Sequence, residues 1–139
     1  MTAFIDTSVI MYAAGAEHPD RAACRRVLER VADGSIDAVT STEVVQEILH
    51  RFARGRRDVG QRMARSVLDL FDELIPINRQ SIAGAVSLYA DHPQLSARDA
   101  LHVATCVDSA IDEIVSVDSG FDAVDQVRRI EPSEIADRA

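Results

Sequence analysis

Four acidic residues stand at positions where a carboxylate could take part in chemistry. Asp6 directly follows the first apolar run of the chain, and Asp118 directly follows a later one. Asp99 lies near the expected start of a helix, and Glu47 borders the apolar stripe of an earlier helix. In open α/β sheets, ligands bind beyond the carboxyl ends of the strands. If the two strands are neighbours, the two aspartates that follow them converge at that edge.

Four convergent carboxylates would point to a bound cation. Negative charge at this density is costly unless something compensates it, and the chain contains no lysine. Oxygen ligands favour a hard ion such as Mg²⁺ or Mn²⁺. One or two such ions could stabilise the attacking and leaving oxygens when a phosphodiester bond is cleaved.

Each acid also has an ordinary structural alternative. Asp6 and Asp118 are suited to cap a helix or form a turn, because an aspartate side chain accepts hydrogen bonds from the backbone that follows it. Asp99 near a helix start is favoured by the helix dipole. A glutamate within a helix, such as Glu47, usually lies on a solvated face. For each residue taken alone, these alternatives stay open.

The acids need a framework of strands and helices that alternate along the chain. Short apolar runs predict strands at residues 3–6, 36–40, 75–77, 114–117 and 127–130. Apolar positions at helical spacing predict helices from Thr7 or Ser8, at residues 20–34, 42–55, 58–74 and 80–90, and from Asp99. The alternation predicts one α/β domain over residues 1–139, with a central, mainly parallel sheet of about five strands and helices on both faces.

Composition narrows the class of protein. The net charge of −8 taken alone argues against a nucleic-acid binder, because phosphate contacts need basic side chains. Bound cations reverse that local charge, and six arginines lie within residues 51–65. No apolar run is long enough to span a bilayer. The two cysteines lack a zinc-binding spacing, which predicts free buried thiols in a cytoplasmic protein.

Four short motifs occur in the order and at the intervals of a known family. They are FIDTSVI, Ser41 followed six residues later by Glu47, LSARDALHVATC, and IVSVDSGFDAV. From residue 3 to about residue 132, the chain resembles a PIN domain, and specifically the VapC-like toxins of VapBC toxin–antitoxin pairs. The resemblance implies a metal-dependent endoribonuclease that inhibits translation or growth. Its ligands for Mg²⁺ or Mn²⁺ would be Asp6, Glu47, Asp99 and Asp118.

The resemblance also implies a further ligand and leaves one assignment open. Asp122 would be an outer ligand or a ligand of a second ion. Glu43 lies one helical turn before Glu47 and competes with it as the second acid. The distance from Ser41 favours Glu47.

Polar neighbours of the acids receive supporting roles from the same resemblance. Thr7, Ser8 and Ser116 would orient ligands or water. Many relatives carry Asn near position 8 and Thr near position 116, so this chain departs from the family at both places. His102 lies three residues after Asp99, hence on nearly the same helix face. Packing or surface exposure is the simpler interpretation of His102, and contact with the substrate is the alternative.

The resemblance implies three partners: an RNA substrate, a small VapB-like antitoxin protein, and a second copy of the chain in a homodimer. Arg51, Arg54 and Arg98 are candidates for contact with the substrate or the antitoxin. Ordinary solvated positions are the alternative for the arginines. No contact with a membrane is expected.

Other classes of protein fit less well. An aspartate-nucleophile phosphatase would need a second acid two residues after Asp6, where Ser8 stands. A phospho-acceptor receiver domain would need a late lysine. A degenerate, non-catalytic PIN-like binding module is the remaining alternative, and the presence of all four acids argues against it.

Overall fold

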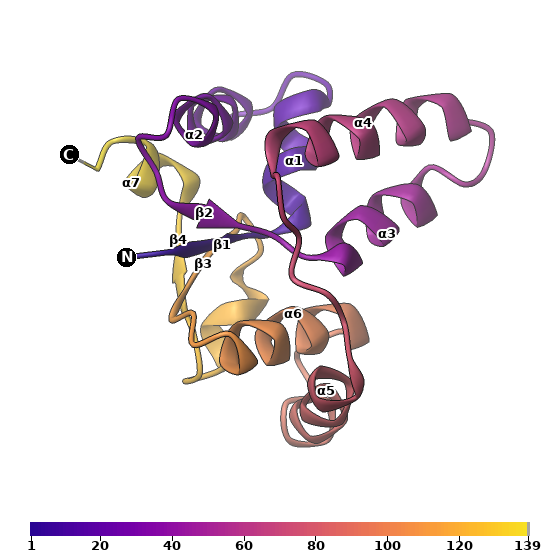
Figure 1. The fold of residues 1–139 in the computed structure, drawn as a ribbon, viewed down its shortest axis with the longest axis vertical. Helices are drawn as coiled ribbons and strands as arrows, with labels where there is room; N and C mark the ends of the chain where they lie inside the picture. The colour runs from indigo at the N-terminus through magenta and orange to yellow at the C-terminus, as the bar shows by residue number, and fades with distance from the viewer. Residues whose placement is uncertain (139) are drawn as a thin grey trace.

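The computed structural model describes residues 1–138 and has an α/β fold built on one parallel sheet (Figure 1). In this part of the chain the sheet order is β2-β1-β3-β4, and every neighbouring pair is parallel. The strands are β1 Ala3–Ile5, β2 Ala38–Val39, β3 Glu113–Val115 and β4 Arg128–Ile130. The predicted fold class is confirmed. The predicted domain ends at residue 139, which lies outside the described residues.

The strand expected at residues 75–77 does not join the sheet. Ile75 makes only an isolated parallel bridge to Ser41, in which the N–H of Thr42 donates to the Ile75 carbonyl over 3.0 Å. Pro76 follows directly, and proline has no N–H with which to extend a ladder. The sheet described here therefore has four strands where about five were predicted.

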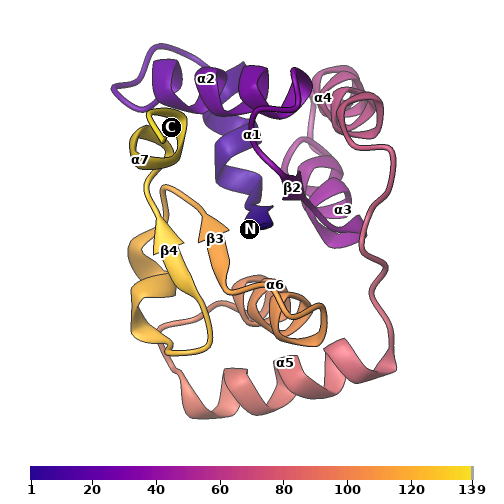
Figure 2. The same ribbon diagram turned by 60° about the vertical axis from the view of Figure 1, so that its left-hand side comes forward.

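Helices cover both faces of the sheet, as predicted. They are α1 Thr7–Ala14, α2 Arg21–Ala32, α3 Thr42–Arg51, α4 Arg57–Leu70, α5 Arg79–Asp91, α6 Ala97–Asp108 and α7 Pro132–Ala136, with a 3-10 helix, η1, at Ser119–Ala123. Figure 1 shows α2 and α6 on opposite sides of the strands, and Figure 2 shows α5 on the outer side of α6. None of the described helices has the length and apolar character needed to cross a membrane.

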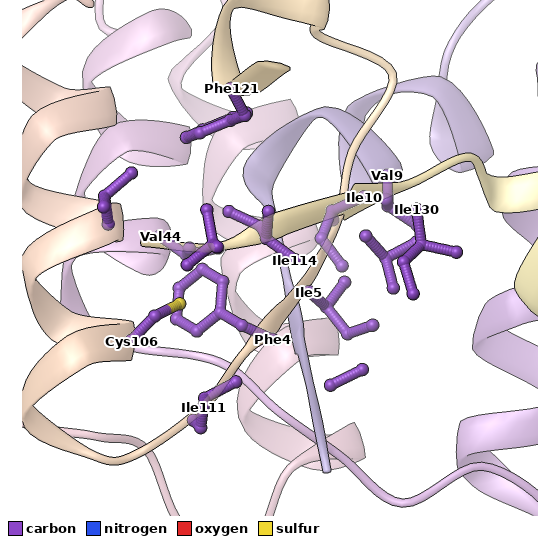
Figure 3. Packing of buried hydrophobic residues seen from close by; sticks show 14 of the residues in the cluster. Phe4, Ile5, Val9, Ile10, Val44, Cys106, Ile111, Ile114, Phe121 and Ile130 are labelled. Carbon is purple, nitrogen blue, oxygen red and sulfur yellow. The ribbon is translucent and has the colours of Figure 1, made fainter. Parts of the chain in front are cut away.

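The core lies on both faces of the central strands. Phe4, Ile5, Ile114 and Ile130 are fully buried, and Figure 3 shows them packed together with Phe121. Strands that are buried on both faces require continuous apolar runs, which is why short runs identified them in the sequence. Both cysteines are buried and free, which confirms the prediction made from their number and spacing.

The parallel register brings the carboxyl ends of β1 and β3 side by side. Ile5 pairs with Val115, and the N–H of Asp6 donates to the Val115 carbonyl over 3.0 Å. β1 lies between β2 and β3. The chain therefore runs from β1 to β2 on one side of it and later adds β3 on the other side. The end of β1 is thus a topological switch point, where open sheets bind their ligands.

Candidate metal centre

Asp6 lies at the carboxyl end of β1 and is almost completely buried. It is the N-cap of α1: its Oδ2 accepts hydrogen bonds from the Ser8 hydroxyl (2.8 Å) and, with a longer contact, from the Ser8 amide (3.4 Å). The Ser116 hydroxyl donates to the same oxygen over 2.7 Å. Oδ1 lies 3.8 Å from His102 Nε2. The hydrogen bonds that cap α1 therefore use Oδ2 of Asp6, whereas Oδ1 faces His102.

Asp99 stands in the first turn of α6, and its N–H donates to the Ser96 hydroxyl over 3.1 Å. This cap starts the helix at Ala97, two residues before the predicted start. Burial and the nearby carboxylates of Asp6 and Asp118 together raise the pKa of Asp99 to about 7. Burial, the larger cause, and the two neighbouring carboxylates both disfavour the charged form of Asp99, and the opposing effect of His102 does not cancel them.

Asp118 follows β3 and is the N-cap of η1, where its Oδ1 accepts from the Gly120 amide over 2.8 Å. The N–H of Asp118 donates to the Ser116 hydroxyl over 2.9 Å. Ser116 thereby links Asp118 to Asp6. The strand itself ends at Val115, earlier than predicted, but the exit still brings Asp118 beside the other two aspartates.

Glu47 is a buried glutamate within α3, not a residue on a solvated face. Its Oε1 accepts hydrogen bonds from the Thr7 hydroxyl (2.8 Å) and from His102 Nε2 (3.1 Å). Its Oε2 accepts from two nitrogens of Arg51, over 3.1 and 3.0 Å. Burial alone would raise the pKa of Glu47, but hydrogen bonds from His102, Thr7 and Arg51 lower it to about 2. Glu47 is therefore ionised and locally neutralised.

His102 is the residue whose role the sequence did not reveal. It is completely buried, so of the two simpler interpretations, packing and surface exposure, the structure supports packing. Its ring lies between the carboxylates of Glu47 and Asp6, with Phe4 on another side at 5.7 Å between ring centroids. Burial opposes protonation, but Glu47, Asp6 and Asp99 outweigh it and raise the pKa of His102. Within the described residues, Nδ1 has no hydrogen-bond partner.

The donor set fits a hard divalent cation. Asp6, Asp99 and His102 each offer a ligand atom, and these atoms lie within 4.8 Å of one another. His102 Nε2 already contacts Glu47, so oxygen atoms of Asp6 and Asp99, with Asp118 beside them, are the groups that could hold an ion. Oxygen donors with uncompensated charge suit Mg²⁺ or Mn²⁺ better than a softer metal.

The acids face an open cleft of about 680 Å³. Asp6, Glu47, Asp99 and Asp118 all line it, so the structure brings the four predicted acids to one surface. Thr7 and Ser8 also line the cleft, and Ser116 contacts Asp6 from outside the cleft lining. The positions of these three hydroxyls fit the predicted role of orienting ligands.

Two further acids lie elsewhere. The structure does not bring Asp122 to the cleft, because both its oxygens accept from Arg129, over 3.0 and 3.1 Å. This ion pair lowers the pKa of Asp122 and leaves the side chain a poor candidate for a ligand. Glu43 lies 3.5 Å from Arg98 Nε and does not line the cleft, which favours Glu47 as the second acid.

The three candidate arginines have different surroundings. Arg51 lines the cleft and holds Glu47. Arg98 faces Glu43 and not the neighbouring Asp99. Arg54 is exposed in the turn after α3, outside the cleft.

Comparison with known proteins places this arrangement in a family. The PIN domain family matches residues 3–127. The chain belongs to the PIN domain family. The VapC ribonuclease Mb1869c of Mycobacterium bovis and ribonuclease VapC13 of Mycobacterium tuberculosis are each 36% identical to it over 127 residues, which cover 91% of this chain and 97% of the relative. Ribonuclease VapC23 of Mycobacterium tuberculosis is 35% identical over 115 residues, covering 83% of this chain and 91% of the relative.

Solved structures share the fold of this PIN domain. VapBC2 from Rickettsia felis, crystallised with a DNA fragment from its promoter, contains a chain that matches with a TM-score of 0.73 and 17% identity. That match covers 94% of this chain and 98% of the other. VapBC-5 from Mycobacterium tuberculosis matches with a TM-score of 0.63 at 17% identity, over 94% of this chain and 98% of that one.

The metal-free PIN domain is expected to lose stability as the pH rises from about 4 to about 7. The folded-state pKa of Asp99, about 7, lies above its ordinary value of 3.8, so the folded state binds this proton more tightly than the unfolded state does. After discounting for solvent screening, the loss is on the order of 2 kcal/mol. Urea unfolding in EDTA at pH 5 and pH 8 measures it. If the free energy of unfolding fell equally with pH in wild type and in Asp99→Asn, the loss would not come from the proton on Asp99.

Proposed function

We propose that this PIN domain is the endoribonuclease toxin of a toxin–antitoxin pair, and that it hydrolyses RNA phosphodiester bonds in the cytoplasm with Mg²⁺ or Mn²⁺. The relatives named VapC ribonucleases support the reaction. The observation that carries the proposal is the group of Asp6, Asp99 and Asp118 at one sheet edge, where burial and then repulsion from the two neighbouring carboxylates raise the pKa of Asp99 to about 7. A site under such repulsion gains stability when a cation enters it.

The bound ion would supply a water of lowered pKa and would neutralise charge on the scissile phosphate. Asp6, fixed through Oδ2 by Ser8 and Ser116, would present Oδ1 to the ion in a single orientation. Asp99 must release its proton to serve as a ligand, so affinity for Mg²⁺ should fall as the pH drops below about 7.

Glu47 has a different position in this proposal. Its two oxygens already accept hydrogen bonds from Thr7, His102 and Arg51. In this arrangement Glu47 would hold those groups in place beside the ion, while Arg51 offsets its charge. Direct ligation by Glu47, as the family resemblance implies, would require Arg51 or Thr7 to give up its contact.

The partners follow from the relatives and neighbours. The two solved neighbours described above are VapBC complexes, which supports a small VapB-like antitoxin as the partner of this chain. Arg54 is exposed near the pair formed by α3 and α4 and is a candidate contact for that antitoxin. Arg51 reaches the cleft and is the stronger candidate for contact with RNA phosphate. A homodimer remains part of the proposal.

Cleavage of a mixed cellular RNA pool tests the activity. Purified, partner-free protein is expected to give discrete fragments with Mg²⁺ or Mn²⁺ and none with EDTA. Asp99→Asn should give no fragments under either condition, because it removes an ionisable ligand while keeping the side-chain shape.

The same samples show what would contradict the proposal. Absence of cleavage by a monodisperse wild-type protein, confirmed free of any copurified small protein, would favour a non-catalytic binding module. Cleavage that survives EDTA would contradict the metal requirement. Cleavage by Asp99→Asn at the wild-type rate would show that the ligands have been assigned wrongly.

A further inference from the structure

Two aromatic rings lie at the edge of the acidic cleft. Tyr12 is in the second half of α1, and His18 is in the loop between α1 and α2. Both line the cleft that the aspartates line. Their ring centroids are 4.4 Å apart and the rings are inclined by 45°. The function proposed above does not use this pair.

The helix sets the distance from this pair to the acids. Ser8 contacts Asp6 through its hydroxyl, at 2.8 Å. Tyr12 follows Ser8 by four residues, so it lies on the same face of α1, about 6 Å further along the axis. Tyr12 therefore stands about one helical turn beyond the residue that contacts Asp6, and it lines the same cleft.

His18 is held in one orientation by its own loop. Its Nδ1 accepts a hydrogen bond from the Asp20 amide over 3.1 Å. A neutral ring whose Nδ1 accepts this bond carries its proton on Nε2, and Nδ1 also lies 3.6 Å from the Asp20 carboxylate. The side chain is 40% exposed, so a ligand can reach it.

Of the phenylalanines and tyrosines in the described part of the chain, Tyr12 alone lines the cleft. The chain has six such residues, all within the described part, and no tryptophan. Phe4, Phe71 and Phe121 are buried in the core, Phe52 packs under the guanidinium of Arg56, and Tyr89 is exposed on α5. None of these five lines the cleft.

We propose that Tyr12 and His18 form a platform that stacks one unpaired RNA base next to the scissile phosphate. The proposal rests on the ribonuclease function proposed above. Proteins that recognise single strands stack splayed bases on aromatic side chains, including tyrosine and histidine. A duplex keeps its bases stacked on one another and offers no free base face to the rings.

Kinetics on a single-stranded oligoribonucleotide that wild type cleaves test the platform. Tyr12→Leu keeps a smaller apolar side chain for packing but removes the aromatic face. We expect KM to rise about tenfold, in line with the usual contribution of base–aromatic stacking, with kcat within about twofold. Tyr12→Phe should keep the wild-type KM, and Tyr89→Leu, on α5, serves as the matched control.

The kinetic outcomes are decisive for the platform. An unchanged KM in Tyr12→Leu would overturn it, as would equal cleavage of the single strand and of the same sequence in a duplex. A loss in kcat alone would also overturn it, because that pattern indicates a damaged metal site and not a lost base contact.

Tyrosine fluorescence separates the platform from the nuclease proposal. Because the chain has no tryptophan and two tyrosines, Tyr89→Phe leaves Tyr12 as the sole tyrosine reporter. In a Tyr89→Phe, Asp99→Asn background with Mg²⁺, which should not cleave, oligouridine is expected to quench the Tyr12 emission. Quenching without cleavage by wild type would retain the platform and reject the nuclease. Cleavage by wild type without quenching would retain the nuclease and reject the platform.

Discussion

Asp6→Asn is expected to reduce metal-dependent RNA cleavage by about a thousandfold, the upper end of what removal of one charge-stabilising group costs. The carboxylate of Asp6 lies at the switch point of the sheet, beside Asp99 and His102. Asparagine keeps an oxygen and the shape of the side chain but loses the negative charge that would hold the ion. Single-turnover cleavage with saturating Mg²⁺ measures the effect.

The fold should survive the Asp6→Asn substitution. Asparagine caps helices as well as aspartate does, and the hydroxyls of Ser8 and Ser116 can accept as well as donate hydrogen bonds. Removal of one of three crowded negative charges should even stabilise the metal-free protein at pH 8. Thermal unfolding in EDTA checks this point and separates loss of chemistry from loss of structure.

Asp122→Asn is the matched control for Asp6→Asn. Asp122 is also an aspartate that follows β3, but it pairs with Arg129 outside the cleft. Cleavage by Asp122→Asn is expected to stay within about twofold of wild type. If Asp122→Asn lost activity as severely as Asp6→Asn, the ligand suggested by the family resemblance would be correct and the cleft assignment incomplete.

The placement of Asp6 and Asp118 was predictable because it depends on a rule of topology. Carboxyl ends of parallel strands share an edge, and both strands are continuous apolar runs that the sequence displays. The same reasoning could not place Asp122. The turn after β3 directs it toward Arg129 on β4, and side-chain direction in a short 3-10 helix is not encoded in any period of the sequence.

Only one of the two charged partners of Glu47, Arg51, could be predicted from the sequence. Arg51 follows Glu47 by four residues on α3, a spacing that predicts their ion pair. His102 is 55 residues away and meets Glu47 only because α3 and α6 both approach the end of β1. Periodicity marks the face of α6 on which His102 lies, but it cannot say which residue of another helix stands opposite. That contact required the tertiary structure.

His102→Ala is expected to lower the free energy of unfolding by about 3 kcal/mol. The substitution removes a fully buried ring that packs near Phe4, and a cavity in the core is costly. It also removes a hydrogen bond to the buried, ionised carboxylate of Glu47, whose Oε1 then keeps only the Thr7 hydroxyl. Urea unfolding at pH 7 measures the loss, and His50→Ala, an exposed histidine on α3, should change stability by less than about 0.5 kcal/mol.

Acid unfolding distinguishes the hydrogen bond of His102 from its packing. The pKa of Glu47 is lowered to about 2, below its ordinary value of 4.5, so its contribution to stability is complete above about pH 4.5 and disappears as the pH falls toward 2. Without His102 the pKa of Glu47 rises, and acid unfolding should begin at a higher pH. His102→Gln, which can still donate to Glu47, should recover part of that shift. If His102→Ala lowered stability equally at every pH, His102 would act through packing alone, and its place between Glu47 and Asp6 would have no electrostatic consequence.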